Sequence, residues 1–566
     1  MRDKISQVWE WFRRRVPEIL LGLFLLALVP LVVQIAWSAY KYLVTLGEDP
    51  GAAVRALGIH WTTTAAAMLC LLGVGVAVYV ILRHWEPIWA VARKLIMEAM
   101  NRKVVVVLFL FFIVLMPSLP FVLKTEGSLK SQVQLVLLYS LSLALVLLSL
   151  VAIFLTTASI CSEVERQHVN VTDTKPLHRW QFLLGKWFGV FILCAASLAV
   201  MTGATYGLVR YMVREPDYST MTEEEKQLAV AERQRIEQEV FTARKAVQAP
   251  LPGPDEEIER KTREWLEQQE RPMAVHSYRQ RLIKEKQQQS QSVTPERPRI
   301  LWRFSGLDPQ EQRTPENRDP LQVRFRPFAF GAPRTVGRFY PLIMVEKEGN
   351  AGQEEPRYEL HRTSFRVASP PGGWQSNRFH EIAIPGRFVQ RDGTLYLAFE
   401  SMTPGTVAFD VDSPIEVLQK EEGFLPNYYR SLVMIMFHVG LLAALGLMAG
   451  SLFSFPVASL VVFCLFVGGM LASWFHSNFV EPNIYAKLTT FTVYLDQAWR
   501  LFAGAVVAVM PNFGSFNPLG DLVNGRMVSA GRVAESSAVL LFIKGGIAMG
   551  IAFYFYTRRE LARLIV

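Results

Sequence analysis

Cysteine is scarce in this sequence, and the positions of the few cysteines limit the chemistry of the chain. Four occur among 566 residues: Cys70, Cys161, Cys194 and Cys464. All four lie within or beside apolar runs, so the polar middle of the chain has none and cannot be cross-linked by disulfides. No two of them have the spacing of a structural zinc site. We therefore expect neither a disulfide framework nor a metal site.

Several enzyme signatures are also missing. The pair Gly185-Lys186 is followed by Trp187 and not by Ser or Thr, so the chain lacks the P-loop whose backbone binds the phosphates of ATP. Neither a Gly-x-Ser-x-Gly nucleophile elbow nor a His-Glu-x-x-His zinc helix occurs. We expect no catalytic residues, no cofactor bound by this chain and no enzymatic activity of its own.

Long apolar runs, by contrast, are abundant. Hydrophobic residues make up 51% of the chain, and a helix that crosses a bilayer needs about 20 consecutive apolar residues. Eight runs reach or approach this length: 17–39, 61–82, 104–123, 133–160, 182–212, 431–450, 457–474 and 537–556. Segment 499–510 is apolar but too short to span, so we expect a re-entrant or interfacial helix there. The pattern predicts an α-helical polytopic membrane protein with about eight transmembrane helices.

The net charge of +9 does not indicate a nucleic-acid partner, because the basic residues cluster beside the apolar runs. Sixteen Lys and Arg lie in the segments on one side of the predicted spans and only four in the short segments on the other side. The positive-inside rule therefore places both termini in the cytoplasm and residues 214–429 outside it. The expected location is a plasma or inner membrane, with the lipid bilayer around the helices.

The polar insert at 214–429 has two parts. Residues 214–295 are rich in Glu, Gln, Lys and Arg, with prolines interrupting the run of helix formers at 250–254. We predict a charged, solvated helical hairpin or stalk there, with a partner-binding coiled coil as the alternative. Residues 296–425 alternate apolar and polar side chains in short runs between Gly and Pro turns, which predicts a β-sandwich. The insert is thus expected to be an extracytoplasmic α+β domain.

A charged segment after the fourth apolar run carries the most specific pattern in the sequence. An acidic and basic start is followed by a Pro-x-x-Arg turn and then by Leu-Leu-Gly-Lys, which opens the next run. The residues concerned are Glu163, Glu165, Arg166, Lys175, Pro176 and Arg179. Their order and spacing resemble the cytoplasmic signature of ABC-2 type permeases, the membrane subunits of ATP-binding-cassette transporters. Gln167 and His168 depart from the Gly-Thr that is usual in that family.

The resemblance implies that this segment forms a short helix that docks on a separate ATPase subunit and moves the two adjoining spans. Glu163, Glu165 and Arg166 would supply charged contacts, and Pro176 would end the helix. Arg179 and Lys186 would meet anionic headgroups. The plainer alternative is an ordinary basic loop with a turn.

Two further regions agree with the resemblance and define the expected domains. Residues 86–103 resemble the amphipathic elbow before the first core span of the family, and residues 510–561 contain motifs of its closing region. The predicted layout is as follows: two added helices at 1–85, the first half of the permease core at 86–213, the insert at 214–429 with parts 214–295 and 296–425, and the second half at 430–566. ATP would be bound by the ATPase subunit, and two permeases would pair as a homo- or heterodimer.

The runner-up hypothesis is a membrane-anchored sensor or scaffold whose β-sandwich binds an envelope ligand without transport. A scaffold needs no ATPase-docking helix between two spans, so the segment from Glu163 to Arg179 discriminates between the hypotheses.

Overall fold

The computed structural model describes most of the chain from residue 85 to residue 558. The described ranges are 85–101, 129–165, 178–214, 222–268, 275–309, 320–346, 358–411, 414–475 and 510–558, with isolated positions between 107 and 118 and between 499 and 504. The predicted spans at 17–39 and 61–82 lie outside the described residues, as do most of 104–123 and 499–510. The chain forms two compact units: the described part of the first comprises 85–98 and 178–190, and the second extends over 99–165 and 191–559.

Five helical segments in the described part are long and apolar enough to cross a membrane. They are α5 (Leu129–Glu165), α7 (Arg179–Met212), α11 (Phe424–Leu452), α12 (Phe455–Phe475) and the continuous segment Ala530–Arg558. That last segment consists of α15 (Ala530–Ser536), the π-helix η6 (Ser537–Lys544) and α16 (Gly545–Arg558). Each coincides with one predicted apolar run, whereas the total of eight spans stays a prediction.

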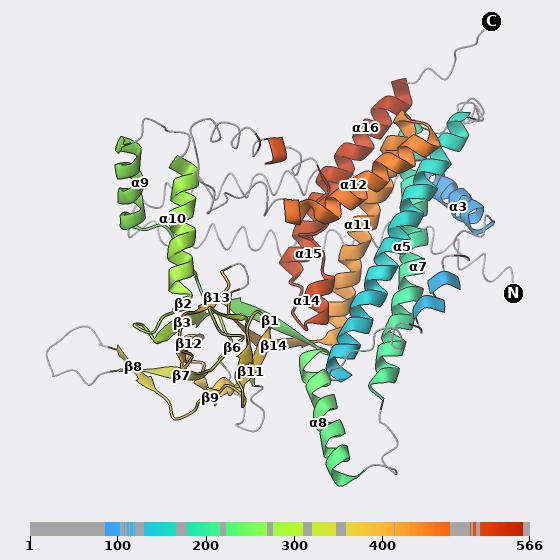
Figure 1. The fold of residues 1–566 in the computed structure, drawn as a ribbon. Helices are drawn as coiled ribbons and strands as arrows, with labels where there is room; N and C mark the ends of the chain where they lie inside the picture. The colour runs from blue at the N-terminus through green and yellow to red at the C-terminus, as the bar shows by residue number, and fades with distance from the viewer. Residues whose placement is uncertain are drawn as a thin grey trace, which may run out of the picture. The chain divides into compact units, whose positions relative to one another are not determined.

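Helix α11 is the centre of the helical part of the second unit. It packs against α5, α12 and α16, as Figure 1 shows. Small residues permit the contact with α5: a Cβ on Gly446 would collide with the Thr156 hydroxyl, and one on Gly450 would stand 3.2 Å from Cβ of Ile160. Glycines at such positions let helix backbones approach closely in a membrane, where water supplies no driving force. The α5–α11 pair therefore forms a close-packed core.

The described residues of the first part of the insert form three helices and two strands, of which β2 (Ser292–Val293) belongs to the sheets of the second part. Helix α8 (Glu223–Glu239) begins with a capping box, in which Thr222 and Glu225 satisfy each other's backbone N–H groups. Helices α9 (Glu256–Gln268) and α10 (Val275–Ser290) pair through stacked Trp265 and Tyr278 rings, whose centroids lie 4.7 Å apart. The expectation of helix throughout this part is wrong at 242–248, which form β1 (Thr242–Gln248). β1 pairs with β14 (Glu416–Gly423), so long-range strand pairing overrides the local helix propensity.

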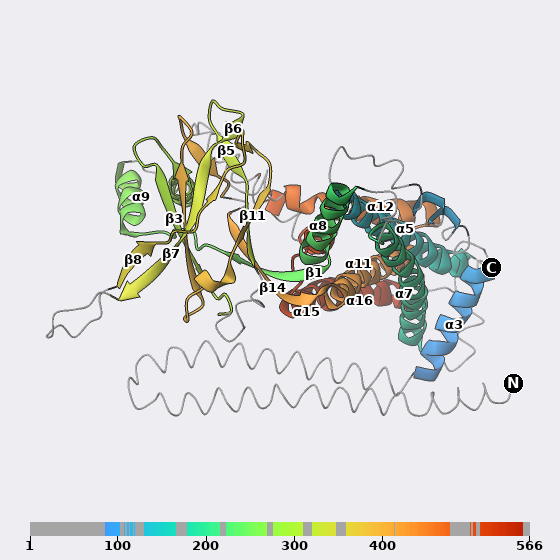
Figure 2. The same ribbon diagram turned by 90° about the horizontal axis from the view of Figure 1, so that it is seen from below.

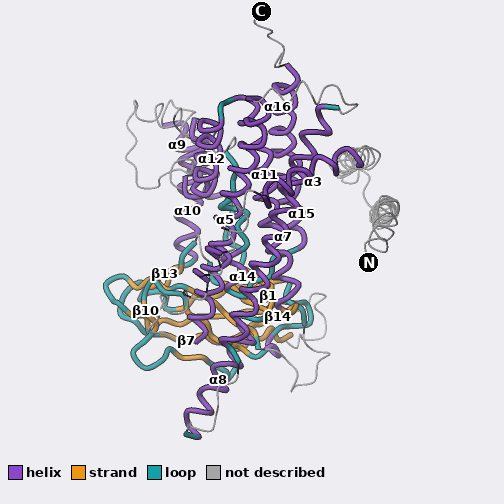
Figure 3. Tube along the Cα trace, turned by 90° about the vertical axis from the view of Figure 1, so that its right-hand side faces the viewer, coloured by secondary structure: helices purple, strands orange, loops and turns teal. Residues whose placement is uncertain are grey.

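The remaining strands form antiparallel sheets. They are β2 (Ser292–Val293), β3 (Arg299–Ser305), β4 (Leu321–Phe325), β5 (Pro327–Ala329), β6 (Arg334–Thr335), β7 (Gly337–Glu346), β8 (Tyr358–Arg362), β9 (Val367–Ala368), β10 (Trp374–Gln375), β11 (His380–Ile384), β12 (Thr394–Ser401) and β13 (Val407–Phe409). The two largest sheets have the orders β1-β14-β4-β11 and β3-β12-β7-β8, and the smaller ones pair β2-β13-β5 and β10-β6. Figure 3 shows these strands gathered near one end of the long helices of the same unit.

One aromatic core lies between the sheets. The ring centroids of Phe325 and Phe339 are 4.6 Å apart, and those of Phe339 and Phe399 are 4.8 Å apart. Trp302 and Trp374 belong to the same buried cluster. β3 alternates strictly between exposed and buried residues, as expected for a strand with one face on a core. The predicted antiparallel strands are therefore present, while the β-sandwich and its extracytoplasmic location stay predictions.

Candidate functional site

The predicted coupling residues divide between the ends of two helices and the segment that joins them. Glu163 and Glu165 lie in the last turn of α5, and Arg179 is the first residue of α7. Arg166, Lys175 and Pro176 lie outside the described residues. The structure thus places both acidic residues at the end of one spanning helix and the arginine at the start of the next.

In the first unit, the start of α7 packs closely on α3 (Trp85–Asn101), which the sequence predicted as an amphipathic elbow. A Cβ on Gly185 would stand 2.7 Å from Cβ of Val91, and one on Gly189 would stand 3.0 Å from the Ala92 carbonyl oxygen. Such distances are too short for any side chain without movement of its neighbour. The two glycines therefore make the contact between α3 and α7 possible.

Sequence reasoning quoted Gly185 as part of a motif but missed the role of Gly189. Together they form Gly185-Lys-Trp-Phe-Gly189, a Gly-x-x-x-Gly pattern whose two glycines lie on one helix face. This spacing of two glycines was the feature of the sequence that could have revealed the role of Gly189. Lys186, expected at the headgroups, is instead only 3% exposed, and its ammonium lies 4.7 Å from the centre of the Phe182 ring. The side chain of Lys186 thus lies over a ring of its own helix, and its contact with headgroups stays a prediction.

The second unit contains a buried polar junction between the four-stranded sheet and the segment before the last spanning helix. Strand register places Arg244, Glu416, Arg324 and Glu381 on the sheet face opposite the aromatic core. Such a face usually meets water. Here Glu416, Arg244 and Arg324 are 2%, 3% and 9% exposed, so another part of the unit covers them.

The segment that covers this polar face of the sheet is the turn between α14 (Leu519–Val523) and α15. This turn pairs with β1 through the backbone. The N–H of Arg244 donates to the Gly525 carbonyl over 2.8 Å, and the N–H of Met527 donates to the Arg244 carbonyl over 2.8 Å. Gly525 has a φ of +64°, and a Cβ there would collide with the Glu239 carbonyl oxygen. Only glycine adopts this turn conformation without strain so close to another backbone.

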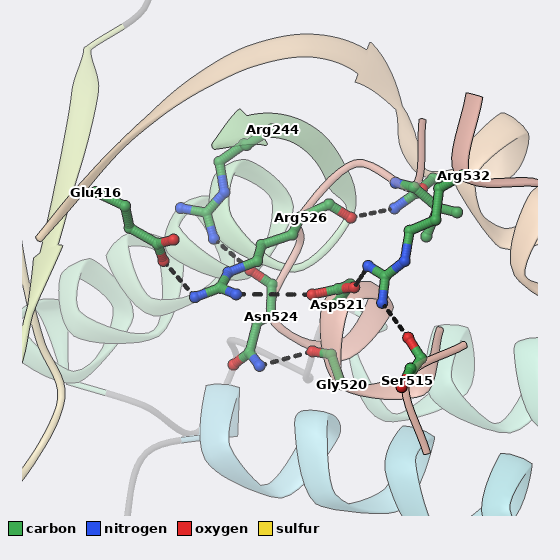
Figure 4. A network of polar contacts seen from close by, with 10 residues as sticks. Arg244, Glu416, Ser515, Gly520, Asp521, Asn524, Arg526 and Arg532 are labelled. Carbon is green, nitrogen blue, oxygen red and sulfur yellow. Dashed lines mark hydrogen bonds and ion pairs between the residues drawn. The ribbon is translucent and has the colours of Figure 1, made fainter. Parts of the chain in front are cut away.

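Ion pairs complete the junction network, which we define as Arg244, Glu416, Asp521 and Arg526. The Arg526 guanidinium donates to the Glu416 carboxylate and lies 3.6 Å from Asp521, which also accepts from Arg532. The Arg244 guanidinium donates to the Asn524 carbonyl over 2.7 Å. Figure 4 shows Arg526 between the Glu416 and Asp521 carboxylates, with Arg244 beside it. The sheet and the membrane part are thus joined by charged groups, of which Glu416 and Arg244 are almost fully buried.

Two spanning helices start at the same junction. Lys130 of α5 pairs with Glu239 and, over 3.1 Å, with Glu381. The Asn427 amide of α11 donates to the Arg526 carbonyl and accepts from the Val528 N–H, both over 2.8 Å. In Figures 1 and 2, β1 and β14 extend from the strands toward the ends of these helices. A displacement of the insert is therefore resisted by direct bonds to α5 and α11.

Burial sets the electrostatics of the junction. It raises the pKa of the Glu416 carboxyl above the ordinary value, against the attraction of Arg526 and Arg324. Burial also opposes the ionisation of Glu381, but Lys130 and Arg244 together hold the pKa of that carboxyl below its ordinary value. The two neighbouring carboxyl groups are thus shifted in opposite directions. In the sequence, the turn dipeptide Asn524-Gly525 was the only sign of the junction. The contact between Glu416 and Arg526 could not be seen there, because it forms only when the strands pair.

The comparison with protein families agrees with this architecture. Residues 89–232 match the family described as ABC-2 family transporter protein, and no curated protein matches the sequence. The match covers most of α3, all of α5 and α7 and the start of α8, whereas the second half of the expected core lies outside it. The resemblance to ABC-2 type permeases is therefore confirmed, and the chain is a multi-pass membrane protein with an ABC-2 family transporter segment at residues 89–232.

Proposed function

We propose that this chain is the membrane-spanning permease subunit of an ABC-2 type transporter and couples ATP hydrolysis by a separate ATPase subunit to transport. The observation that carries the proposal is the pair of spanning helices α5 and α7 within the family match, joined by the charged segment 166–177. The chain has no P-loop, so ATP is bound by the partner. Two permeases pair as a homo- or heterodimer.

Helix α7 provides the means of transmission. It is one continuous helix from Arg179 to Met212, and helices are stiff along their axis because every turn is hydrogen-bonded. Near its far end, the Thr202 carbonyl accepts a 2.9 Å hydrogen bond from the Tyr428 hydroxyl, and Tyr206 stacks on Phe424 of α11. Motion of the segment that includes Glu163, Glu165, Arg166, Lys175, Pro176 and Arg179 therefore reaches α11 through α7.

Charge placement supports the orientation. The basic segments put both termini and residues 166–177 in the cytoplasm, where the ATPase resides, and the insert outside. The junction network then lies at the extracytoplasmic ends of α5 and α11. In this orientation the insert, which is bonded to both helices, is positioned to receive substrate or an envelope partner.

The test is co-purification of the ATPase with the variant Glu163→Lys/Glu165→Lys at matched expression. Loss of charge-assisted contacts at an interface costs about 2–5 kcal/mol when they are buried, and about 1.4 kcal/mol is tenfold in affinity. We expect at least tenfold weaker binding. The matched control is Glu223→Lys/Glu224→Lys, an equal charge reversal at the exposed start of α8. Equal recovery of the ATPase with both variants would contradict coupling and favour the scaffold hypothesis.

A further inference from the structure

The sheet of order β3-β12-β7-β8 has one face against the aromatic core, and its opposite face is strongly basic. Along β3, Trp302 lies in the core whereas Arg299 and Arg303 are exposed on the other side, because successive side chains of a strand alternate. Strand register adds residues of the three neighbouring strands to the same side. The charged residues of this basic face, as we call it, are Arg299, Arg303, Arg338, Arg362 and Glu400.

Three of the arginines converge on the one carboxylate. Nε of Arg338 donates to Glu400 over 2.6 Å, and Nε of Arg299 donates over 3.0 Å. Nη2 of Arg362 donates to the same carboxylate over 3.3 Å. The hydrogen bond from Arg338, together with that from Arg299, holds the pKa of the Glu400 carboxyl below its ordinary value, so it is ionised at neutral pH. Four arginines and one carboxylate leave an excess of three positive charges on the basic face.

Two tyrosine rings orient the guanidinium groups. The Arg362 guanidinium lies 4.0 Å from the centre of the Tyr340 ring, and that of Arg303 lies 5.9 Å from the centre of the Tyr396 ring. Both rings are buried, at 3% and 7% exposed, whereas the Arg299 and Arg362 side chains are 59% and 39% exposed. A guanidinium that stacks on a ring keeps its N–H edge available for a planar acceptor. The charged groups therefore lie at the surface, above a layer of buried aromatic rings.

An apolar side chain lies among these charges. Leu301 stands between Arg299 and Arg303 on β3 and is 47% exposed. Arginine and tyrosine are enriched in protein–protein interfaces and lysine is depleted there, and the positive charges of the basic face all come from arginine. This combination is typical of a surface that binds another protein.

We propose that the basic face binds an acidic segment of another protein, whose carboxylates pair with the arginines around Leu301. The contacts of Glu400 show that these arginines can surround a carboxylate. Four strands span about 14 Å, and Arg299 and Arg303 are about 13 Å apart along β3. One small anion cannot reach charges spread over this area, whereas successive carboxylates of an acidic segment can.

An anionic bilayer is the competing partner. Basic clusters that bind such a surface act mainly through their charge, to which Lys and Arg contribute alike. On the basic face, by contrast, Glu400 and the two tyrosines orient the guanidinium groups. Oriented guanidinium groups favour carboxylates, which they bind in a directed and often bidentate way. Binding to a bilayer is therefore one of the outcomes that the experiment distinguishes.

This inference deepens the proposed function, on which it rests for the compartment in which the insert meets an envelope partner. The experiment requires no ATPase. Its failure would therefore leave the coupling proposal intact, and a failure of coupling would leave the basic face to be tested.

The full-length protein is reconstituted in phosphatidylcholine nanodiscs and immobilised, and two fluorescent probes are added separately. One probe is a polyglutamate peptide, and the other is a preparation of phosphatidylglycerol vesicles. We expect the wild type to bind the peptide with an affinity that falls as salt is added. Arg303→Glu/Arg362→Glu should weaken this binding about tenfold or more, because it replaces two attractions by two repulsions.

The matched control is Arg260→Glu/Arg281→Glu, an equal charge reversal at exposed positions of α9 and α10. It should bind the peptide as the wild type does. Equal weakening by both double variants would overturn the proposal, because it would show that only the net charge of the protein matters. Binding of the vesicles without the peptide, lost in Arg303→Glu/Arg362→Glu, would overturn it in favour of a bilayer, and binding of neither probe would also overturn it.

A second variant keeps the test decisive if the charge reversal next to Glu400 prevents folding, which thermal unfolding would reveal. Arg303→Lys/Arg362→Lys retains every charge but removes the planar N–H forks. If the arginines bind carboxylates as proposed, this variant should bind the peptide several-fold more weakly than the wild type. Unchanged affinity would contradict directed recognition by the basic face.

Discussion

Gly185 of α7 lies so close to Ile88 of α3 that a Cβ on the glycine would stand 2.8 Å from the Ile88 carbonyl oxygen. Backbone atoms cannot move aside as a flexible side chain can, so the contact tolerates no side chain at this position. The elbow helix is therefore held on the first turns of α7, directly after the predicted coupling segment.

Replacing this glycine should weaken the contact. We expect Gly185→Ala to destabilise the protein by about 1–3 kcal/mol, the usual range for overpacking. The control is Gly203→Ala on the same helix, where a Cβ meets nothing within 4 Å and alanine favours the helix. Thermal unfolding of the full-length protein measures both variants, and equal Tm values would contradict the importance of the α3–α7 contact.

The length of the apolar runs predicted the five long apolar helices that the structure describes, because a span needs length and hydrophobicity and little else. The predicted runs at 133–160 and 182–212 correspond to α5 and α7. Strand alternation likewise predicted β4 and β12. Both patterns are local: they can be read from neighbouring residues, because the side chains that face the core recur with the period of the helix or strand.

Long-range pairing was not predictable in the same way. Residues 242–248 carry two basic residues and a helix-compatible composition, and they become a strand only because β14 and the turn at Gly525 flank them. The same pairing assembles the junction network from residues almost 300 positions apart, such as Arg244 and Arg526. No spacing in a single sequence encodes such a contact, so the junction could not be predicted.

The orientation of the insert can be tested by cysteine labelling. Leu228→Cys and Met402→Cys introduce thiols at exposed positions of the insert, in a background without the native cysteines. Both should react with a membrane-impermeant reagent on intact cells, since the insert is predicted to be outside. His178→Cys, exposed next to the coupling segment, should react only after lysis. The opposite labelling pattern would show that the insert lies in the cytoplasm and the coupling segment outside.

Glu416 and Glu381 should contribute to stability with opposite pH dependence. The pKa of Glu416 is raised, so the folded state binds its proton more tightly than the unfolded state, and its contribution to stability falls as pH rises above the ordinary value of 4.5. The pKa of Glu381 is lowered, so its contribution is present above 4.5 and is lost as pH falls through the lower folded value.

Glu416→Gln and Glu381→Gln should therefore change the slope of Tm against pH in opposite directions between about pH 3 and 7. The variant at Glu416 should lose stability less steeply than the wild type as pH rises, and the variant at Glu381 should lose it less steeply as pH falls. Glu224→Gln, at an exposed position on α8, controls for removal of a charge. Parallel slopes for the two junction variants would show that the carboxyl groups do not differ as described.

The ion pair of Arg526 and Glu416 should stabilise the attachment of the insert to the membrane part. Its Glu416 side chain is 3% exposed, and removal of one partner of a buried pair costs about 3–5 kcal/mol because the other charge remains buried. Arg324 still attracts the Glu416 carboxylate, so we expect a cost toward the lower end of that range. Arg526→Ala should therefore lower the Tm strongly, and Arg526→Ala/Glu416→Ala should lower it less than the two single changes added together. The coupling expected from such a double-mutant cycle is about 0.5–3 kcal/mol.

The comparison pair is Arg299 and Glu400, where Arg338 and Arg362 also bind the carboxylate. Arg299→Ala therefore leaves Glu400 paired and should cost about 1 kcal/mol or less. A cost for Arg526→Ala no larger than that for Arg299→Ala, together with additive effects in the cycle, would mean that the junction is held by the β1 backbone pairing and not by its charges.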